Sequence, residues 1–234
     1  ADWVVEAVVE RIDIKHQIYE KIFKTRKEGA IVSSNTSSIP IKVLSEHLTD
    51  KEKKDFCITH FFNPVRFMRL LEIVETPLIN IKKISSLRDF CKNELGKGIV
   101  NCNDTPGFIG NRIGVYAMQV AMYEALDRGL NVEIADALFG RPLGIPKTGV
   151  FGLYDLIGID LMKDVLASFK KELQENDPFM EVVKPHIIVE KLLEKGFTGN
   201  KGPGGFYETK TIDDNEIVKA LNTSDMSYYD FDKV

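Results

Sequence analysis

A histidine and a carboxylate in the first half of the chain have the types and spacing of a general base with an orienting partner. His60 lies near the end of the apolar run 56–61, and Glu72 lies inside the next apolar run, 70–74. A carboxylate that accepts from one imidazole nitrogen fixes the tautomer and raises the basicity of the other nitrogen. Without further context, a hydrogen-bonded structural histidine is the commoner outcome, and a solvated strand residue is the alternative for Glu72.

Two further polar residues are candidates for binding a ligand. Ser37 lies in the loop 35–38, where an ordinary helix-capping hydroxyl before Pro40 is the competing interpretation. Asn111 falls inside a predicted helix, and asparagine is a poor helix former. A polar task such as hydrogen bonding to a ligand is therefore one explanation for Asn111, and chance is the other.

The sequence predicts no metal site. Cys57 and His60 are three residues apart on a predicted strand, which points their side chains to opposite faces, and no C-x-x-C or H-x-x-x-H spacing occurs. Neither of the two common glycine-rich phosphate-binding motifs is present, since the glycines at 202–205 have the wrong spacing. A nucleotide-binding sheet built from this sequence would lack its phosphate-binding first turn.

The residues up to 103 have the pattern of an α/β domain with a parallel sheet. The apolar strand 3–9, the helix 11–28 and the strand 30–34 form a crossover unit, whose loops follow the carboxyl ends of the strands. In open α/β sheets ligands bind at that edge, where Ser37 and His60 are expected to lie. The remaining predicted elements are a short helix at 40–47, a charged turn at 50–54, strands at 56–61 and 70–74, a helix at 81–95 and a strand at 98–102.

From Asp104 onward the pattern changes to helices. Thr105 can cap a helix whose first position is Pro106, and apolar residues at spacings of three and four extend that helix to about Tyr123. A segment rich in glycine and proline follows at 140–149, before helices at 153–157, 161–175 and 182–193. The predicted organisation is a sheet domain at 1–103, an all-helical domain at 104–210 and a polar tail at 211–234.

Composition excludes some classes of partner. The formal net charge of −4, with 28% charged residues, gives no broad basic field for a nucleic acid. No apolar run approaches the roughly 18 residues that a membrane span needs. The three cysteines are odd in number and far apart, which fits a reducing compartment without a disulfide framework.

Taken together, these residues resemble the 3-hydroxyacyl-CoA dehydrogenase family of fatty-acid β-oxidation. The likeness covers about residues 3–207 and is specific because four ordered motifs occur at compatible separations. The motifs are Ser34-Asn35-Thr36-Ser37-Ser38, His60-Phe61-Phe62-Asn63-Pro64, Asp104-Thr105-Pro106-Gly107-Phe108 with Asn111-Arg112, and Gly204-Gly205-Phe206-Tyr207.

The resemblance implies a partial Rossmann-like domain followed by an all-helical domain that forms a homodimer, with NAD as cofactor and an acyl-CoA as substrate. It implies that His60 is the base that removes the substrate's hydroxyl proton, and that Glu72 orients His60. It also implies that Ser37 and Asn111 hydrogen-bond the substrate's oxygens. The positions implied to lie near the nicotinamide half of NAD are Glu10, Lys15, Ser37 and Lys201.

The sequence departs from the family at both ends. Because a buried strand begins at Trp3 and the glycine-rich turn is missing, we expect a chain truncated at its N-terminus that binds NAD weakly or not at all, which calorimetry can test. The tail beyond Tyr207, with Arg66 to Glu72 and Pro146 to Gly152, resembles longer relatives that also carry enoyl-CoA hydratase activity.

Two rival functions remain open at this stage. One is a non-catalytic acyl-CoA-binding or assembly module derived from the family. The other is a relative that acts on a free 3-hydroxy acid or a sugar acid. Cysteine usage fits either a bacterial cytoplasm or a mitochondrial matrix.

Overall fold

The computed structural model describes residues 1–144, 147–212 and 215–231. The chain divides into two compact units, Ala1–Ile113 and Gly114–Val234. The predicted boundary at 103/104 and the division at 113/114 therefore differ by ten residues, and the helix α5 (Gly110–Asp127) runs through the division. Each unit has a hydrophobic core of its own.

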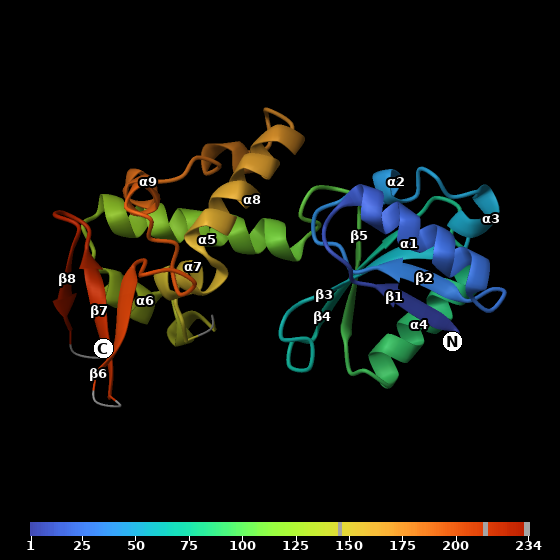
Figure 1. Ribbon diagram of the computed structural model, residues 1–234, viewed down its shortest axis with the longest axis horizontal. Helices are drawn as coiled ribbons and strands as arrows, with labels where there is room; N and C mark the ends of the chain where they lie inside the picture. The colour runs from blue at the N-terminus through green and yellow to red at the C-terminus, as the bar shows by residue number, and fades with distance from the viewer. Residues whose placement is uncertain (145–146, 213–214, 232–234) are drawn as a thin grey trace. The chain divides into compact units, whose positions relative to one another are not determined.

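The first unit contains the predicted Rossmann-like sheet (Figure 1). Its five strands lie in the order β1-β2-β3-β4-β5, and all neighbours are parallel except β3 and β4. The strands are β1 (Trp3–Glu6), β2 (Ile31–Ser34), β3 (Phe56–Phe61), β4 (Leu70–Glu75) and β5 (Gly98–Cys102).

The antiparallel pair corrects one part of the predicted parallel sheet. Only residues 62–69 connect β3 to β4, and a parallel pair needs a crossover of a dozen or more residues. The chain therefore turns back on itself, so the start of β4 lies at the same edge of the sheet as the end of β3. This reversal places Glu72, the third residue of β4, directly opposite His60.

Helices cover both faces of the sheet (Figure 1). On one face, Tyr19 of α1 (Ile12–Thr25) and Leu44 of α2 (Ile41–Leu44) pack against Val32 and Ile58. On the other face, α4 (Ile81–Asn93) packs against Cys57, Leu71 and Ile73. The predicted charged turn near residue 50 forms a short helix, α3 (Asp50–Lys53), with a capping box between Thr49 and Glu52. The strands are thus held between two apolar layers, which fixes the edge of the sheet where β3 ends and β4 begins.

The predicted start of the long helix at Pro106 is wrong. The helix α5 begins at Gly110, and residues 106–109 form a turn. The turn has a left-handed backbone at Gly107 (φ +71°) and at Phe108 (φ +48°), which cannot continue a right-handed helix. As a result Asn111 lies in the first turn of α5, not in its interior, and the argument from poor helix propensity no longer applies to it.

The second unit is helical in its first part. The apolar faces of its helices meet in a core that contains Met122, Phe151, Tyr154 and Leu192. After α5 come α6 (Val132–Leu138), α7 (Phe151–Ile157), α8 (Ile159–Glu172) and α9 (Ile187–Glu194), with short 3₁₀ turns at Arg141–Leu143 and Pro178–Glu181. The sequence pattern did not predict α6.

The region expected to be a polar tail contains strands. A three-stranded antiparallel sheet is formed by β6 (Tyr207–Ile212), β7 (Asn215–Asn222) and β8 (Ser227–Asp230). Ala220 and Leu221 are buried, and Leu221 belongs to the core of the second unit. The second unit is therefore helical with an added sheet that closes part of its core.

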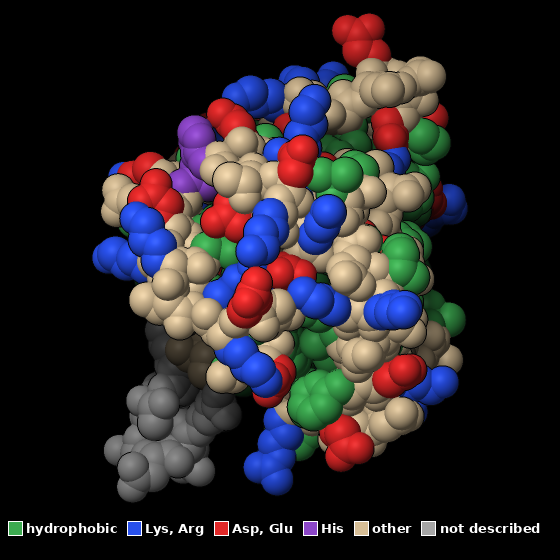
Figure 2. Space-filling model, turned by 90° about the vertical axis from the view of Figure 1, so that its right-hand side faces the viewer, with side chains coloured by type: hydrophobic (Ala, Val, Ile, Leu, Met, Phe, Trp, Pro, Cys, Tyr) green, Lys and Arg blue, Asp and Glu red, His purple; other side chains and the backbone are tan. Residues whose placement is uncertain are grey.

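Charged side chains of both signs are interspersed on the face drawn in Figure 2. This surface agrees with the mixed composition and the small net charge of the sequence. Among the helices that the structure describes, none is long and apolar enough to cross a membrane.

Candidate active site

His60 and Glu72 form a buried hydrogen-bonded pair. They are register partners in the β3–β4 ladder, and the distance from His60 Nδ1 to Glu72 Oε2 is 2.7 Å. The side chain of His60 is 7% exposed and that of Glu72 is fully buried. Directly opposed residues on one face of an antiparallel pair bring their side chains into contact. The sheet therefore holds the two side chains against each other, as the sequence suggested.

The second oxygen of Glu72 is held by the backbone. Its Oε1 accepts hydrogen bonds from the N–H groups of Ile109 (2.9 Å) and Gly110 (2.6 Å). These donors become available because the turn at Gly107 and Phe108 precedes α5, and the first N–H groups of a helix have no partner within the helix. Glu72 thus also serves as an acceptor at the N-terminus of α5, where negative charge is favoured.

The charge of Glu72 determines the tautomer of His60. Burial by itself would raise the pKa of Glu72, but the hydrogen bonds from His60 and from the Gly110 and Ile109 N–H groups outweigh burial and hold that pKa below its usual value. A carboxylate can only accept a hydrogen bond, so Nδ1 of His60 carries the hydrogen. The lone pair of the neutral ring is then on Nε2, which has no hydrogen-bond partner among the described residues.

Aromatic rings and a thiol complete the surroundings of the pair. The ring centroids of Phe62 and Phe108 lie 4.5 Å and 5.7 Å from that of His60. The Cys102 thiol lies 3.6 Å from Glu72 Oε1, and burial together with the charge of Glu72 raises the pKa of Cys102 to about 12. Cys102 therefore stays protonated at neutral pH and acts as a weak donor to Glu72.

A second hydrogen-bonded group contains three of the predicted cofactor residues. Glu10 accepts from the Ser37 N–H group (3.3 Å), and Lys15 Nζ lies 3.1 Å from Glu10 Oε2. Burial raises the pKa of Glu10, but hydrogen bonds from Thr36, Lys15 and Ser38 and the charge of Lys15 lower it below its usual value. The side chain of Lys15 is fully buried, whereas Ser37 is exposed in the loop after β2. Glu10, Lys15 and Ser37 are therefore brought together.

The last two predicted residues lie at other points of the chain. Asn111 directly follows Gly110, whose N–H group binds Glu72, and its side chain is half-buried. Lys201 belongs to the second unit, where its Nζ donates to the backbone oxygen of Ile157 at 3.0 Å. The role of Lys201 near a cofactor stays a prediction.

Two residues near the site were missed by sequence reasoning. Glu6 is the last residue of β1 and lies in an otherwise apolar run of the sequence, and it is buried. Asn35 follows β2, and its Oδ1 accepts from the N–H group of Phe61, the residue after His60, at 2.9 Å. A lone acid in an apolar run was a visible signal for Glu6. The role of Asn35 depends on a contact 26 residues along the chain, which sequence spacing does not reveal.

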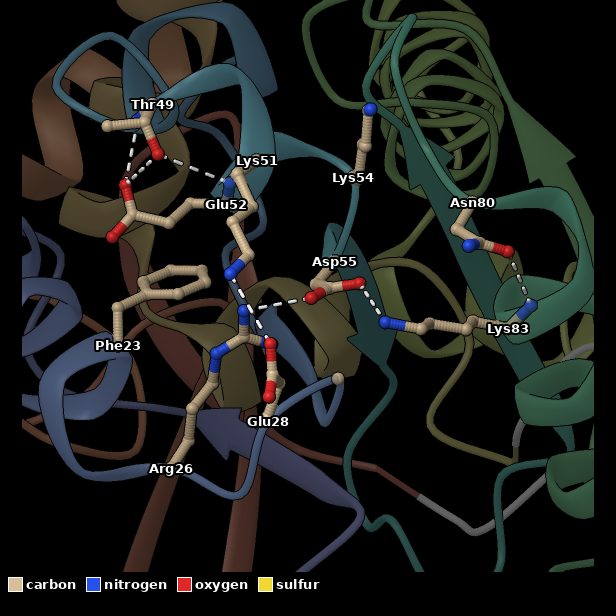
Figure 3. Close-up of a pocket in the computed structure, with 11 residues that line it drawn as sticks. Phe23, Arg26, Glu28, Thr49, Lys51, Glu52, Lys54, Asp55, Asn80 and Lys83 are labelled. Carbon is tan, nitrogen blue, oxygen red and sulfur yellow. Dashed lines mark hydrogen bonds and ion pairs between the residues drawn. The ribbon is translucent and has the colours of Figure 1, made fainter.

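A polar pocket lies near the start of β3, whereas His60 lies near the end of that strand. Figure 3 shows the charged side chains that line this pocket. It has a volume of about 510 Å³ and is centred near Asp55, the residue that precedes β3. Arg26 and Lys83 both donate to Asp55, and the distance from Arg26 to Asp55 Oδ2 is 2.8 Å. Because these charges satisfy one another, we interpret the pocket as a structural ion-pair cluster.

Two family models match the chain over almost all of its length. The NAD binding domain of 3-hydroxyacyl-CoA dehydrogenase matches residues 1–105, and the C-terminal domain of 3-hydroxyacyl-CoA dehydrogenase matches residues 107–209. The two matches follow each other in the order in which the two units occur here. They cover the His60–Glu72 pair, the Ser37 loop and Asn111.

Individual relatives agree with the family models. A Rickettsia felis protein named as a fatty acid oxidation complex trifunctional enzyme is 42% identical over 233 residues, which is 100% of this chain and 32% of that protein. The mitochondrial hydroxyacyl-coenzyme A dehydrogenase of Sus scrofa is 37% identical over 211 residues, 89% of this chain and 64% of that protein. The chain thus spans about a third of the first relative and under two thirds of the second.

Solved structures show the same fold. The (S)-3-hydroxybutyryl-CoA dehydrogenase of Ralstonia eutropha superimposes with a TM-score of 0.72 at 29% identity, over 86% of this chain and 68% of that chain. The 3-hydroxybutyryl-CoA dehydrogenase of Escherichia coli gives a TM-score of 0.72 at 29% identity, over 89% of this chain and 42% of that chain. The fold, the two family models and the relatives lead to one conclusion: the chain belongs to the 3-hydroxyacyl-CoA dehydrogenase family.

Proposed function

We propose that this chain carries the acid-base part of an NAD-dependent oxidation of 3-hydroxyacyl-CoA to 3-oxoacyl-CoA. The observation that carries the proposal is the buried His60–Glu72 pair, which leaves Nε2 of His60 with a lone pair and no partner among the described residues. A general base needs a nitrogen that can accept a proton and a neighbour that stabilises the resulting cation. Family membership adds the substrate class.

The proton transfer follows from the pair's geometry. Nε2 of His60 takes the proton of the C3 hydroxyl as the C3–H bond breaks, and the ring becomes an imidazolium. Glu72 stabilises that cation through the 2.7 Å contact with Nδ1. In the reverse direction the imidazolium returns the proton to the carbonyl oxygen of the substrate. Phe62 and Phe108 limit the access of water to the ring, which strengthens the interaction with Glu72.

The residues around Ser37 suit the nicotinamide half of NAD. When bound, NAD supplies the acceptor for the hydride that leaves C3 of the substrate. Glu10 presents a carboxylate that accepts hydrogen bonds, as ribose hydroxyls require, and Ser37 presents an exposed hydroxyl. We therefore assign Glu10, Lys15 and Ser37 to the nicotinamide side, with Lys201 as the fourth residue on the family pattern.

Ser37 and Asn111 are assigned to the oxygens of the substrate. A hydroxyl and an amide can each donate a hydrogen bond to the oxygen at C3, where negative charge develops during the reaction. Asn111 is supported by its place next to Gly110, which binds the partner of His60. Ser37 is supported by its exposure in the loop after β2, at the carboxyl edge of the sheet.

An assay of the polypeptide that the gene encodes tests this proposal. We expect NAD-dependent oxidation of 3-hydroxybutyryl-CoA and much slower turnover of free 3-hydroxybutyrate. Binding of the thioester without turnover would instead support a non-catalytic acyl-CoA-binding module. Preference for the free acid would support a relative that oxidises a different substrate class.

We further propose a homodimer formed through the second unit, in the bacterial cytoplasm or the mitochondrial matrix. Large apolar side chains are exposed on that unit, among them Leu138 (54%), Leu156 (55%) and Leu161 (45%). Such side chains mark an association site where they form a contiguous surface, and the family resemblance supports an association site on this unit. The compartment is supported by bacterial relatives and a mitochondrial one. Sedimentation of the purified chain at several concentrations tests the dimer.

A further inference from the structure

A buried carboxylate that the proposed reaction does not use lies at the end of β1. Glu6 is 3% exposed, and each of its two oxygens accepts two hydrogen bonds. The donors to Oε1 are Val8 N (2.7 Å) and Lys15 Nζ (2.8 Å), and the donors to Oε2 are Tyr19 Oη and Ser34 Oγ, both at 2.7 Å. A buried carboxylate is costly unless it is paired and fully hydrogen-bonded, and Glu6 meets both conditions. It is therefore a rigid acceptor inside the first unit.

Lys15 connects Glu6 to a second carboxylate, that of Glu10. Its fully buried ammonium group lies between Glu6 Oε1 at 2.8 Å and Glu10 Oε2 at 3.1 Å. Lys15 comes from the first turn of α1, whereas Glu6 and Glu10 precede the helix. A long, flexible lysine side chain adopts one conformation only when its terminal ammonium group is held by fixed partners. Glu6 holds Lys15 from the interior side, and Lys15 in turn fixes Glu10.

Glu10 then holds the loop that carries Ser37. Its Oε1 accepts from the Thr36 hydroxyl, from the Ser37 N–H group at 3.3 Å and from the Ser38 hydroxyl at 3.1 Å. A loop residue that is exposed has few contacts of its own to fix its position. Ser37 is exposed, so its backbone position depends on Glu10 and on the neighbouring Thr36.

We infer that Glu6 is a positioning residue for Ser37, acting through Lys15 and Glu10. The effect on substrate binding rests on the proposed function, whereas the effect on the loop does not. A role confined to general stability would weaken the whole first unit evenly. A positioning role instead predicts a change concentrated at residues 36–38, far along the chain from the substitution, with no change in strand β3.

Hydrogen exchange of the full chain with Glu6→Gln tests the inference independently of activity. Glutamine keeps the shape of the Glu6 side chain, but its NH2 group faces one of the two pairs of donors to Glu6. The substitution also removes the negative charge that holds Lys15. We expect amide exchange at residues 36–38 to accelerate by about tenfold or more, with exchange in β3 unchanged. The matched control is Glu20→Gln on α1. The side chain of Glu20 is 69% exposed, and its Oε2 lies 3.9 Å from Lys24 Nζ. The control should leave both segments unchanged.

A double-mutant cycle that compares KM with kcat adds a measurement that a general loss of stability does not change. We expect Glu6→Gln to raise KM for the thioester more than it lowers kcat, and to add little when Glu10→Gln is already present. If Glu6→Gln does not fold, Tyr19→Phe removes one donor to Glu6 and should accelerate exchange at 36–38 by about threefold. Unchanged exchange at 36–38 in a folded Glu6→Gln or Tyr19→Phe chain overturns the inference. Absence of turnover by the wild-type polypeptide that the gene encodes would contradict the proposed function, while leaving the exchange result intact.

Discussion

Glu72 lies directly opposite His60 in the antiparallel ladder of β3 and β4, with 2.7 Å between Oε2 and Nδ1. The same carboxylate accepts two backbone N–H groups at the start of α5. One buried side chain thus joins the two strands to the helix that carries Asn111. The orientation of His60 therefore depends on the strand register and on the turn before α5.

Replacing Glu72 by glutamine tests the orienting role. The amide keeps the size of the side chain, but its NH2 group must face either His60 Nδ1 or the N–H groups of Ile109 and Gly110. Donor then faces donor, unless His60 changes tautomer and gives up the lone pair on Nε2. We expect kcat/KM for acetoacetyl-CoA reduction to fall by about 10–100-fold. A variant with wild-type kcat/KM at every pH would show that Glu72 does not orient the base.

The low pKa of Glu72 predicts how stability changes with pH. Its folded-state pKa lies below the unfolded value of 4.5, so its ionised form stabilises the fold at any pH above that value. The contribution is lost as the pH falls through the folded pKa. The difference in urea midpoint between wild type and Glu72→Gln should therefore be largest near neutral pH and shrink in acid.

Fluorescence of Trp3 is a suitable probe for that experiment. It is the chain's only tryptophan, and it lies in the first unit with Glu72. The Trp3 indole donates to Ser33 at 2.9 Å, so unfolding of the sheet changes its surroundings. A difference between the two proteins that grows as the pH falls would contradict the assigned direction of the pKa.

Gly110 is predicted to tolerate no side chain. A Cβ atom at this position would lie 2.5 Å from Phe62 Cζ and 3.2 Å from Leu70 Cδ2. Gly110→Ala should therefore displace Phe62 or the start of α5, at a cost of about 1–3 kcal/mol in the free energy of unfolding. It should also lower activity, because the Gly110 N–H group binds Glu72.

Gly114 provides the matched control on the same helix. No described atom beyond its own helix backbone and chain neighbours lies within 4 Å of a Cβ atom built there, and it has a helical position. Gly114→Ala should be neutral or stabilise the protein by about 0.5–1 kcal/mol. Equal effects of the two alanine substitutions, measured by urea unfolding, would show that the contact with Phe62 is not a constraint.

The elements could be predicted from the sequence where the apolar pattern is continuous. The strands β3 and β5 begin and end at the predicted residues 56–61 and 98–102, because each is a short buried run between polar segments. The family and its fold could also be predicted, because four motifs occur in the right order.

What could not be predicted depends on contacts between distant residues. The capping pattern at Thr105 and Pro106 predicts a helix from residue 106, yet α5 begins at Gly110 because the backbone is left-handed at Gly107 and Phe108. The N–H groups of Ile109 and Gly110 then bind Glu72, 37 and 38 residues away. The strands β7 and β8 lie in a largely polar stretch, where Ala220 and Leu221 are the buried residues among those of residues 218–230. Alternating patterns as weak as this one are easily taken for loops.

The partners of Glu6 could not be predicted from the sequence either. Its donors Lys15, Tyr19 and Ser34 lie 9, 13 and 28 residues away along the chain. A lone acid in an apolar strand signals a buried polar task, but it does not identify the partners.

The most direct test of the account is the effect of His60→Gln on acetoacetyl-CoA reduction by NADH, in the polypeptide that the gene encodes. Glutamine can hydrogen-bond but cannot give a proton to the carbonyl oxygen of the substrate, as the imidazolium does in this direction, so kcat should fall by about 10²–10⁴-fold. Substrate binding should change little, and His47→Gln, which alters an exposed histidine of the same unit, should keep wild-type activity. A folded His60→Gln protein with kcat close to wild type would contradict the assignment of His60 as the base.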